Sequence, residues 1–445
     1  MSGAAGRHVV IVGAGLGGAL VACELAAQGY RVSVYERRPD PRGAGFIGGR
    51  SINLALSARG IAALQRVGLA ERVLKDAVPM RGRMMHDPAG GLVYQAYSKE
   101  PKEAINSVSR GGLNLTLLEA AAAHDGVTLH FDHRCTDLDL EGATALFETG
   151  GREVRVEADL IIGADGAFSA VRGHLQRTDR FDYSQSYLEH GYKELHIPPT
   201  AAGEFAMEPH ALHIWPRGGF MMIALPNQDR SFTCTLFWPF RGARSFESIP
   251  DRDAVLPFFE KWFGDAVPLM PTLVEDYQRN PVSSLVTVRC WPWVYADRVA
   301  LLGDAAHAIV PFYGQGMNAA FEDCTALARC LEAHGHEFAP ALADYQQERK
   351  QNADAIADMA LDNFVEMRDH VASPVFRARK RFERLLHRMI PDQFVPLYNM
   401  VSFSTIPYAE ARRRAARQWT RVMQGLVAAL VLLLLLVLIL ILLLT

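Results

Sequence analysis

The sequence predicts an α/β fold in which a parallel sheet is interleaved with an antiparallel sheet, followed by C-terminal helices and an apolar tail. Three observations predict it. A β-branched run, a glycine-rich turn and a helix of small residues open the chain, which is typical of a βαβ unit. Short runs of alternating polarity fill the middle, as in antiparallel sheets. Residues 425–444 are all apolar, which is long enough to cross a bilayer.

The composition is that of an ordinary globular protein. The 445 residues are 49% hydrophobic and 21% charged, which excludes wholesale disorder. A net charge of −3 does not favour a nucleic-acid partner. The six cysteines are scattered, with no Cys-x-x-Cys pair and no metal-ligand spacing, so we expect a reduced, intracellular chain without a metal site.

The first motif is Gly13-x-Gly15-x-x-Gly18, which follows the predicted strand at residues 8–12. Such a turn lets backbone N–H groups approach a pyrophosphate at the positive end of a helix. Glu36 stands at the end of the next predicted strand, where a carboxylate accepts hydrogen bonds from ribose hydroxyls. The opening segment therefore predicts a Rossmann-like dinucleotide site.

A second match to the same glycine pattern, Gly43-x-Gly45-x-x-Gly48, is interpreted as a loop near the active site. It follows Pro-Asp-Pro-Arg instead of a strand, and no helix opens after it. One dinucleotide-binding unit therefore remains, and a second, stably docked nucleotide would usually require another.

Two further motifs each follow a predicted buried strand. They are Gly163-Ala164-Asp165-Gly166 and Gly303-Asp304-Ala305-Ala306-His307, and the second continues into a helix that begins near Gly316. A carboxylate at a strand end suits a polyol, and N–H groups at a helix start suit an anionic ring edge. We interpret His307 as structural. Each motif alone also fits a capped turn, but three in this order indicate one cofactor site.

The remaining chain is predicted as strands in the middle and helices around them. The predicted strands are 52–56, 211–216, 220–226 and 231–238, and the predicted helices are 58–74, 113–123 and 339–388.

The order of the three motifs resembles the single-component flavoprotein aromatic hydroxylases. Within that group, six longer strings resemble the kynurenine 3-monooxygenase family, and the resemblance runs from about residue 8 to about residue 410. The strings are Gly49–Ser57, Met80–Met84, His190–Leu195, Leu212–Pro216, Pro311–Asn318 and Asn363–Met367.

The resemblance implies bound FAD, NADPH as a transient co-substrate, and O₂. It implies hydroxylation of L-kynurenine to 3-hydroxykynurenine through a flavin C4a-hydroperoxide, a step of tryptophan degradation that leads toward NAD. Because the arylamine activates its own ring, no protein base is required, and no catalytic residue is assigned.

The resemblance also implies the site residues. For the substrate these are Arg83, Tyr97, Phe312, Gln315, Asn363 and Tyr408. For the cofactors they are Gly13, Gly15, Leu16, Gly18, Glu36, Arg37, Ala55, Arg110, Asp165, Asp304, Gly316, Met317 and Asn318. The chain departs from the family pattern after Arg110, where Gly111-Gly112 replace larger polar residues.

The implied division of the chain alternates between two domains. Segments 1–78, 104–180 and 290–370 form the FAD-binding domain, the last with a long helix. Segments 79–103 and 181–289 form the substrate domain, and 371–424 and 425–444 form the C-terminal helices and a transmembrane anchor.

Two alternatives stay open. A flavin-dependent hydroxylase or halogenase acting on another aromatic ring would share the fold, and Trp291-Pro292-Trp293 is similar to the tryptophan pair of halogenases. The Ile-Pro that follows there is missing, so we interpret these residues as packing. A membrane-tethered flavin scaffold without activity would not need the substrate residues.

The C-terminal segment predicts a tail anchor. Five arginines (Arg412, Arg413, Arg414, Arg417, Arg421) and Trp419 precede the apolar run, which fits the positive-inside rule and the aromatic belt. We expect the body of the protein on the cytoplasmic side of a bacterial inner membrane or a mitochondrial outer membrane. A homodimer is left open.

Overall fold

The computed structural model describes residues 3–44, 53–98, 103–249, 251–366, 374–391 and 393–444. Most of the second glycine pattern, including Gly45 and Gly48, lies outside these residues. The same is true of Gly49–Ile52 and Met367, which belong to two of the strings that carry the resemblance.

A six-stranded sheet forms the first layer, in the order β18-β19-β12-β1-β2-β8. Its neighbours pair in parallel except β18 and β19. All five residues of β1 are buried because helices cover both faces of the sheet. The strands are β1 (His8–Val12), β2 (Arg31–Tyr35), β8 (Val127–His130), β12 (Leu160–Gly163), β18 (Val294–Tyr295) and β19 (Val299–Leu301).

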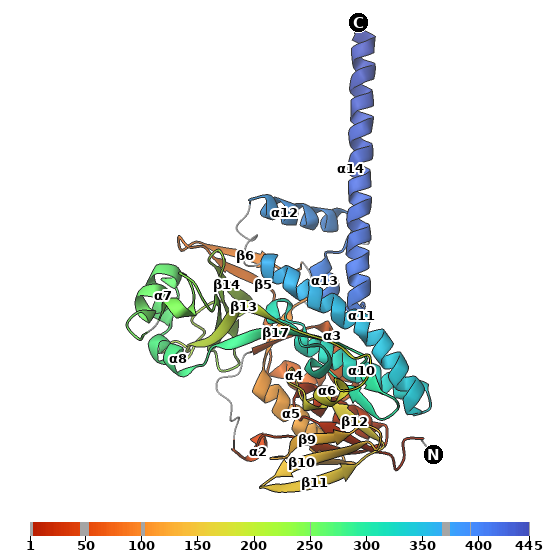
Figure 1. Cartoon of the computed structure of the whole chain (residues 1–445). Coiled ribbons are helices and arrows are strands. Elements are labelled where there is room, and N and C mark those ends of the chain that lie inside the picture. Colours follow the sequence, from red (N-terminus) through yellow and green to blue (C-terminus); the bar gives the residue numbers. More distant parts are fainter. Residues whose placement is uncertain are drawn as a thin grey trace.

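A seven-stranded sheet forms the second layer, in the order β17-β13-β16-β15-β14-β5-β6 (Figure 1). Its strands are β5 (Gly82–His86), β6 (Leu92–Ala96), β13 (Asp182–Ile197), β14 (Ala211–Pro216), β15 (Met221–Pro226), β16 (Phe232–Pro239) and β17 (Ser283–Trp291). All neighbours are antiparallel except β5 and β14, which pair in parallel. These two strands come from distant segments, so no hairpin imposes an antiparallel direction.

Two small sheets complete the strands. The first has the order β3-β7-β4, with β3 (Asn53–Leu56), β4 (Val78–Met80) and β7 (Ile105–Ser109). The second has the order β11-β10-β9, with β9 (Arg134–Asp139), β10 (Thr144–Thr149) and β11 (Arg152–Glu157).

The helices differ from the prediction mainly where glycine interrupts them. The helix expected at 58–74 is two helices, α3 (Ala58–Arg66) and α4 (Ala70–Lys75), because Gly68 between them has a φ of +72°. Around the first sheet lie α1 (Leu16–Ala27), α2 (Pro41–Ala44), α5 (Arg110–Ala122), α6 (Ala170–Leu175), α9 (Asp304–His307) and α10 (Gly316–Ala333). The others are α7 (Val255–Phe263), α8 (Leu273–Arg279), α11 (Phe338–Val365), α12 (Pro374–Met389), α13 (Leu397–Ser402), α14 (Tyr408–Leu444) and the 3₁₀ turns η1 (Phe246–Ser248), η2 (Val267–Leu269) and η3 (Pro311–Tyr313).

Helix α14 leaves the body of the protein and projects alone (Figure 1). Its first turn is part of the core, since Tyr408 and Ala411 are buried. Its apolar part is exposed, and it is long and apolar enough to cross a membrane. The predicted α/β architecture, with a mainly parallel sheet, a mainly antiparallel sheet and a long apolar C-terminal helix, is confirmed.

A network of buried charges joins the helices behind the first sheet. Glu322 and Asp323 lie side by side on α10, and Asp323 accepts hydrogen bonds from His307 at 2.5 Å and Arg349 at 2.6 Å. Glu322 pairs with Arg349 at 3.1 Å and with the fully buried Arg59 at 2.5 Å. Burial alone would raise the pKa of Asp323, but His307 and Arg349 outweigh it and hold that pKa below its usual value.

Arg59 also ties the C-terminal segment to this network. Its guanidinium donates hydrogen bonds to the carbonyl oxygens of Val401 and Ile406 and lies 3.9 Å from the centre of the Tyr408 ring. The one buried guanidinium of Arg59 therefore contacts three elements at once: Glu322 on α10, the Ile406 carbonyl after α13 and the Tyr408 ring at the start of α14.

We expect Arg59→Leu to be strongly destabilising. It leaves Glu322 with one cation instead of two and leaves two buried carbonyl groups without a donor, which costs about 3–5 kcal/mol. Thermal unfolding checks this. The matched control is Arg72→Leu, because the Arg72–Glu119 pair is exposed and is worth at most about 1 kcal/mol. Equal unfolding temperatures for the two variants would contradict the assignment.

Candidate cofactor and substrate site

The three predicted motifs meet at one edge of the first sheet. β1, β12 and β19 are neighbouring parallel strands, so their carboxyl ends lie together. Gly13 follows β1, Asp165 follows β12 and Asp304 follows β19. Ligands of open α/β sheets bind at this kind of edge.

The glycine turn has the shape that a pyrophosphate needs. Gly13 has a φ of +105°, and a Cβ there would lie 2.5 Å from the carbonyl oxygen of Ala164. A Cβ on Gly18 would lie 1.9 Å from the Gly13 oxygen. Gly15, in contrast, faces open space at the N-cap of α1, where no side chain caps the free N–H groups. Leu16 begins the helix. The turn is thus closed on the protein side and open on the ligand side.

Glu36 lies beside this turn at the end of β2. One of its oxygens accepts a hydrogen bond from the Ala14 N–H at 3.0 Å, and the other accepts from Arg38 Nε at 2.8 Å. Burial would raise its pKa, but these bonds outweigh burial and hold the pKa below its usual value. The carboxylate is therefore ionised and fixed. Arg37, next to it, is exposed.

Asp165 plays a more local part than the sequence suggested. One carboxylate oxygen accepts a hydrogen bond from Ser169 Oγ at 2.5 Å, and the other accepts from the Ala170 N–H at 2.6 Å. Both oxygens are thus used to cap α6. The motif contributes to the site through Ala164, whose carbonyl lies so close to Gly13 that no side chain fits there.

The two polar residues of the motif after β19, His307 and Asp304, have different surroundings. His307 bonds Asp323 and stacks on Trp293, with ring centroids 5.1 Å apart, so its contacts are structural. Asp304 is exposed at the edge, within electrostatic reach of the exposed Arg110. Arg110 also acts on Glu194 of β13, whose pKa is raised by burial to about 7, the nearby guanidinium opposing that rise.

The start of α10 is tied to β3 by one amide. Asn318 Nδ2 donates to the carbonyl oxygens of Ala55 at 2.8 Å and Gly314 at 3.0 Å, and its Oδ1 accepts from the Ser57 N–H at 3.0 Å. Gly316 and Met317 precede it in the first turn and are partly exposed. This amide brings two segments that are more than two hundred residues apart to the same place.

The second part of the site is a cluster of Arg83, Tyr97 and Tyr398. The Arg83 guanidinium lies 4.8 Å from the centre of the Tyr398 ring and 5.6 Å from that of Tyr97, and the two rings stack 5.2 Å apart. Arg83 Nε and Tyr97 Oη are buried without a hydrogen-bond partner. Among the described residues no carboxylate pairs with Arg83. Burial raises the pKa of Tyr97, so its hydroxyl stays a neutral donor.

Gln315 belongs to the same set of unpartnered atoms. Its Nε2 is buried without a partner, while its Oε1 accepts a hydrogen bond from Tyr408 Oη at 2.9 Å. The structure therefore places Tyr408 behind Gln315, fully buried, and away from the Arg83 cluster. Asn363 Nδ2 donates to the Phe312 carbonyl at 2.6 Å, so it positions the η3 turn that carries Phe312.

Tyr398 is the site residue that sequence reasoning missed. It stacks on Tyr97 and also on Tyr313 of η3, at 5.7 Å. It comes from α13, a short helix whose place over the sheet depends on Arg59 and not on a local motif. An aromatic residue in a short helix is usually packing, so the sequence carried no signal for it.

One face of the seven-stranded sheet extends from the Arg83 cluster across β14, β15 and β16 to β13. Arg83 and Leu212 are register partners, and Ile214 pairs with Ile223, so these side chains share that face. Thr235 and Glu194 continue the row on β16 and β13, and Thr235 Oγ1 is buried without a partner. Leu212, Ile223 and Tyr398 pack against two groups of buried apolar residues, one that contains Ile214 and Phe312 and one formed by Met80, Ile105 and Leu225. The face is apolar, with polar atoms at its two ends.

The comparisons with known proteins agree with this geometry. The family model for the FAD binding domain matches residues 7–360. Kynurenine 3-monooxygenase of Salinispora tropica is 51% identical over 93% of this chain and 91% of its own, and that of Myxococcus xanthus is 48% identical over 97% and 92%. The Dictyostelium discoideum enzyme is 48% identical over 92% and 90%.

The chain belongs to the kynurenine 3-monooxygenase family. Solved structures share the fold at lower identity. One is 2-methyl-3-hydroxypyridine-5-carboxylic acid oxygenase, with a TM-score of 0.67 and 20% identity over 83% of this chain and 94% of the other. Another is PqsL of Pseudomonas aeruginosa, with a TM-score of 0.66 and 23% identity over 82% and 97%.

As a kynurenine 3-monooxygenase family member the chain has to hold FAD, and the residues present fit that cofactor. The open side of the turn at Gly15 suits the pyrophosphate, and the ionised Glu36 suits a ribose. The N–H groups at the start of α10 suit an anionic ring edge. Trp293, in contrast, is fully buried and donates to the Cys290 carbonyl at 2.9 Å, which is packing.

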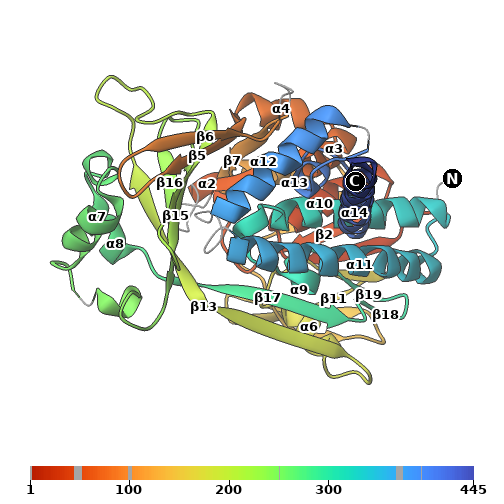
Figure 2. The same ribbon diagram turned by 90° about the horizontal axis from the view of Figure 1, so that it is seen from above.

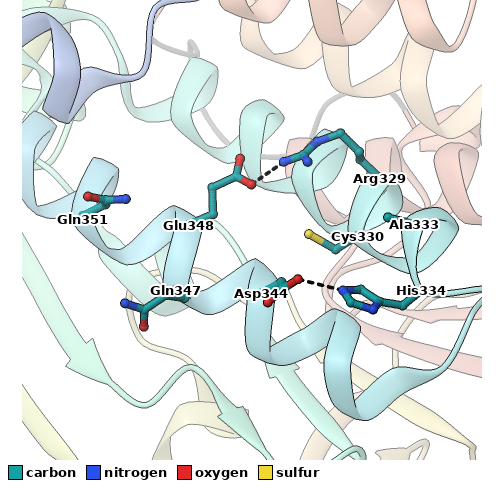
Figure 3. A pocket seen from close by; sticks show the side chains of 8 residues that line it. All are labelled: Arg329, Cys330, Ala333, His334, Asp344, Gln347, Glu348 and Gln351. Carbon is teal, nitrogen blue, oxygen red and sulfur yellow. Dashed lines mark hydrogen bonds and ion pairs between the residues drawn. The ribbon is translucent and has the colours of Figure 1, made fainter.

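A separate hollow on the surface does not belong to this site (Figure 3). It measures about 330 Å³ and lies between the C-terminal half of α10 and the middle of α11. Its charged groups pair with one another, Arg329 with Glu348 and His334 with Asp344 at 2.7 Å (Figure 3). We assign no ligand to it.

We expect Gly13→Ala to abolish FAD retention. A methyl group at this position meets the Ala164 carbonyl and requires a backbone conformation that L-residues rarely adopt. Flavin absorbance per protein after gel filtration measures the effect. Gly173→Ala in α6 is the control, since its Cβ faces open space, and it should retain FAD. Full flavin content in Gly13→Ala would contradict the site.

Proposed function

We propose that the protein hydroxylates L-kynurenine to 3-hydroxykynurenine, using FAD, NADPH and O₂. The proposal rests on one observation above all: Arg83 lies between Tyr97 and Tyr398 with its Nε buried and unpartnered. A partly buried guanidinium whose Nε has no partner is costly, so the position favours a ligand that brings a carboxylate.

The chemistry of L-kynurenine matches the two ends of the apolar face. Its α-carboxylate suits the planar guanidinium of Arg83 with the Tyr97 hydroxyl as a further donor. Its arylamine ring suits the face formed by Leu212, Ile214 and Ile223, which packs in one cluster with Phe312. We infer that segments 79–103 and 181–289 serve as the substrate domain because their strands form this face.

The chain's own contribution to the reaction is position and exclusion of water. Bound FAD supplies the hydride acceptor and the oxygen chemistry. Arg83 and Tyr97 hold the amino-acid end, which fixes how far the ring reaches along the apolar face. The rings of Phe312 and Phe364 pack with their centroids 4.4 Å apart. Together with the surrounding aliphatic side chains they keep water from the reacting ring carbon.

The first test is NADPH oxidation by the FAD-loaded protein with and without L-kynurenine, with the product identified by mass and retention. We expect stimulation and 3-hydroxykynurenine. Hydrogen peroxide as the only product would mean that L-kynurenine binds without being hydroxylated. A requirement for chloride or bromide would favour halogenation, and no stimulation would contradict the proposed substrate.

Arg83→Ala should raise KM for L-kynurenine by about a hundredfold or more, because it removes a charge-assisted bidentate contact of at least ~3 kcal/mol. FAD content should stay unchanged, since Arg83 lies outside the glycine turn. Arg81→Ala is the matched control: Arg81 is two residues away and exposed, and its variant should keep the original KM. Equal KM values for both variants would argue against Arg83 as the carboxylate receptor.

We further propose that α14 anchors the protein in a membrane, with the body on the cytoplasmic side. The exposed apolar part of the helix and the arginines before it support this. Deleting residues 425–444 should move the protein from the membrane to the soluble fraction, while Tyr408 and Ala411 remain in the core. A truncated protein that still sediments with membranes would refute the anchor.

A further inference from the structure

Helix α12 lies roughly at a right angle to α14, with one end beside it, on the side of the body from which α14 projects (Figure 1). Seen along α14, α12 lies on the near side of the body, above α13 and α10 (Figure 2). The contact with α14 is specific. The Arg379 guanidinium lies 5.0 Å from the centre of the Trp419 ring, and the Phe394 ring meets that indole edge-on at 5.8 Å.

The height of this contact corresponds to the edge of a bilayer. Trp419 stands six residues before Gly425, where the apolar run begins, so the two are about 9 Å apart along the helix. The polar headgroup layer on each side of a ~30 Å hydrocarbon core is about 5–8 Å thick. If α14 spans the membrane, α12 meets the outer edge of the headgroup layer.

The outward face of α12 suits that layer. Arg381, Leu385, Arg388 and Met389 follow one another at helical spacing, and all four are exposed, Leu385 by 49% and Met389 by 69%. The opposite face holds the helix to the body, since Glu383 is buried and His387 Nδ1 bonds the Phe394 carbonyl at 2.7 Å. Large apolar side chains alternate with cations on the side that the described residues leave exposed.

The positive charge of α12 favours binding to a negatively charged surface. Residues 374–389 contain six arginines and lysines and one acid, Glu383. In the part of the chain that the structure describes, no acid pairs with Arg381 or Arg388. Lipid phosphates and anionic headgroups are therefore the complementary partner, and the cytoplasmic leaflet is the anionic one.

We propose that α12 is an interfacial helix that binds the anionic surface of the bilayer that α14 crosses. The proposal rests on α14 as the membrane anchor. Together the two helices form a two-point contact, one along the membrane normal and one in the plane, which fixes the orientation of the body. A single spanning helix alone would leave the body free to rotate about it.

The test uses the full-length, FAD-loaded protein in vesicles, labelled with an environment-sensitive fluorophore at Met389→Cys. Five of the native cysteines are buried, and Cys135→Ser removes the one that is partly exposed. Glu153→Cys on β11, at the opposite end of the body, is the control site (Figure 1). Quenching by headgroup-labelled lipid is compared between vesicles of phosphatidylcholine alone and vesicles containing phosphatidylserine. Flotation of the vesicles reports the anchor separately.

We expect strong quenching at Met389→Cys, little at Glu153→Cys, and more quenching with phosphatidylserine. Arg381→Glu with Arg388→Glu should abolish the phosphatidylserine dependence, since each arginine contributes roughly fivefold to binding, while flotation stays unchanged. Protein that does not float would refute the anchor. Protein that floats with Met389→Cys no more quenched than Glu153→Cys would refute the docking of α12 alone. Fluorescence at Met389→Cys that changes with the number of protein molecules per vesicle but not with lipid charge would mean that this face contacts a second copy of the chain. That result would also overturn the proposal.

Discussion

The pair of acids on α10, Asp323 fully buried and Glu322 partly buried, is the constraint on which the arrangement of the site depends. Their partners come from three different segments: Arg59 after β3, His307 after β19 and Arg349 on α11. Satisfying the acids therefore brings together the turn that ends in His307, the start of α3 and the C-terminal segment that Arg59 holds. The cofactor edge and the Arg83 cluster share one support.

The network and the site differ in how completely their polar atoms are paired. Every carboxylate oxygen of Asp323 has a donor, whereas Arg83 Nε, Tyr97 Oη and Gln315 Nε2 are buried with none. Paired buried charges hold a fold in one arrangement, while unpaired buried donors are stabilised only when a ligand arrives. Two of these unpaired donors, Arg83 Nε and Tyr97 Oη, lie together at one end of the apolar face.

Local chemistry explains what the sequence could predict. The turn from Gly13 to Gly18 and the position of Glu36 follow from neighbouring residues, and both were predicted. The antiparallel strands 211–238 were also readable from their alternation. Tyr398 was not, because its place against Tyr97 depends on contacts between α13, Arg59 and the sheet, and no spacing in the chain encodes those. Asp165 is the converse case: the motif was recognised, and the structure adds that its carboxylate accepts hydrogen bonds from its own helix.

The two ends of α14 have different surroundings, since its first turn is buried in the core and its apolar part is exposed. Its first turn places Tyr408 under Arg59 and against Gln315, so this part of the helix supports the cofactor edge. Its last five turns are exposed and apolar. A helix is stiff over this length, and α12 braces it at Trp419, between the two ends. The contact at Trp419 therefore lies between the buried first turn of the helix and its exposed apolar part.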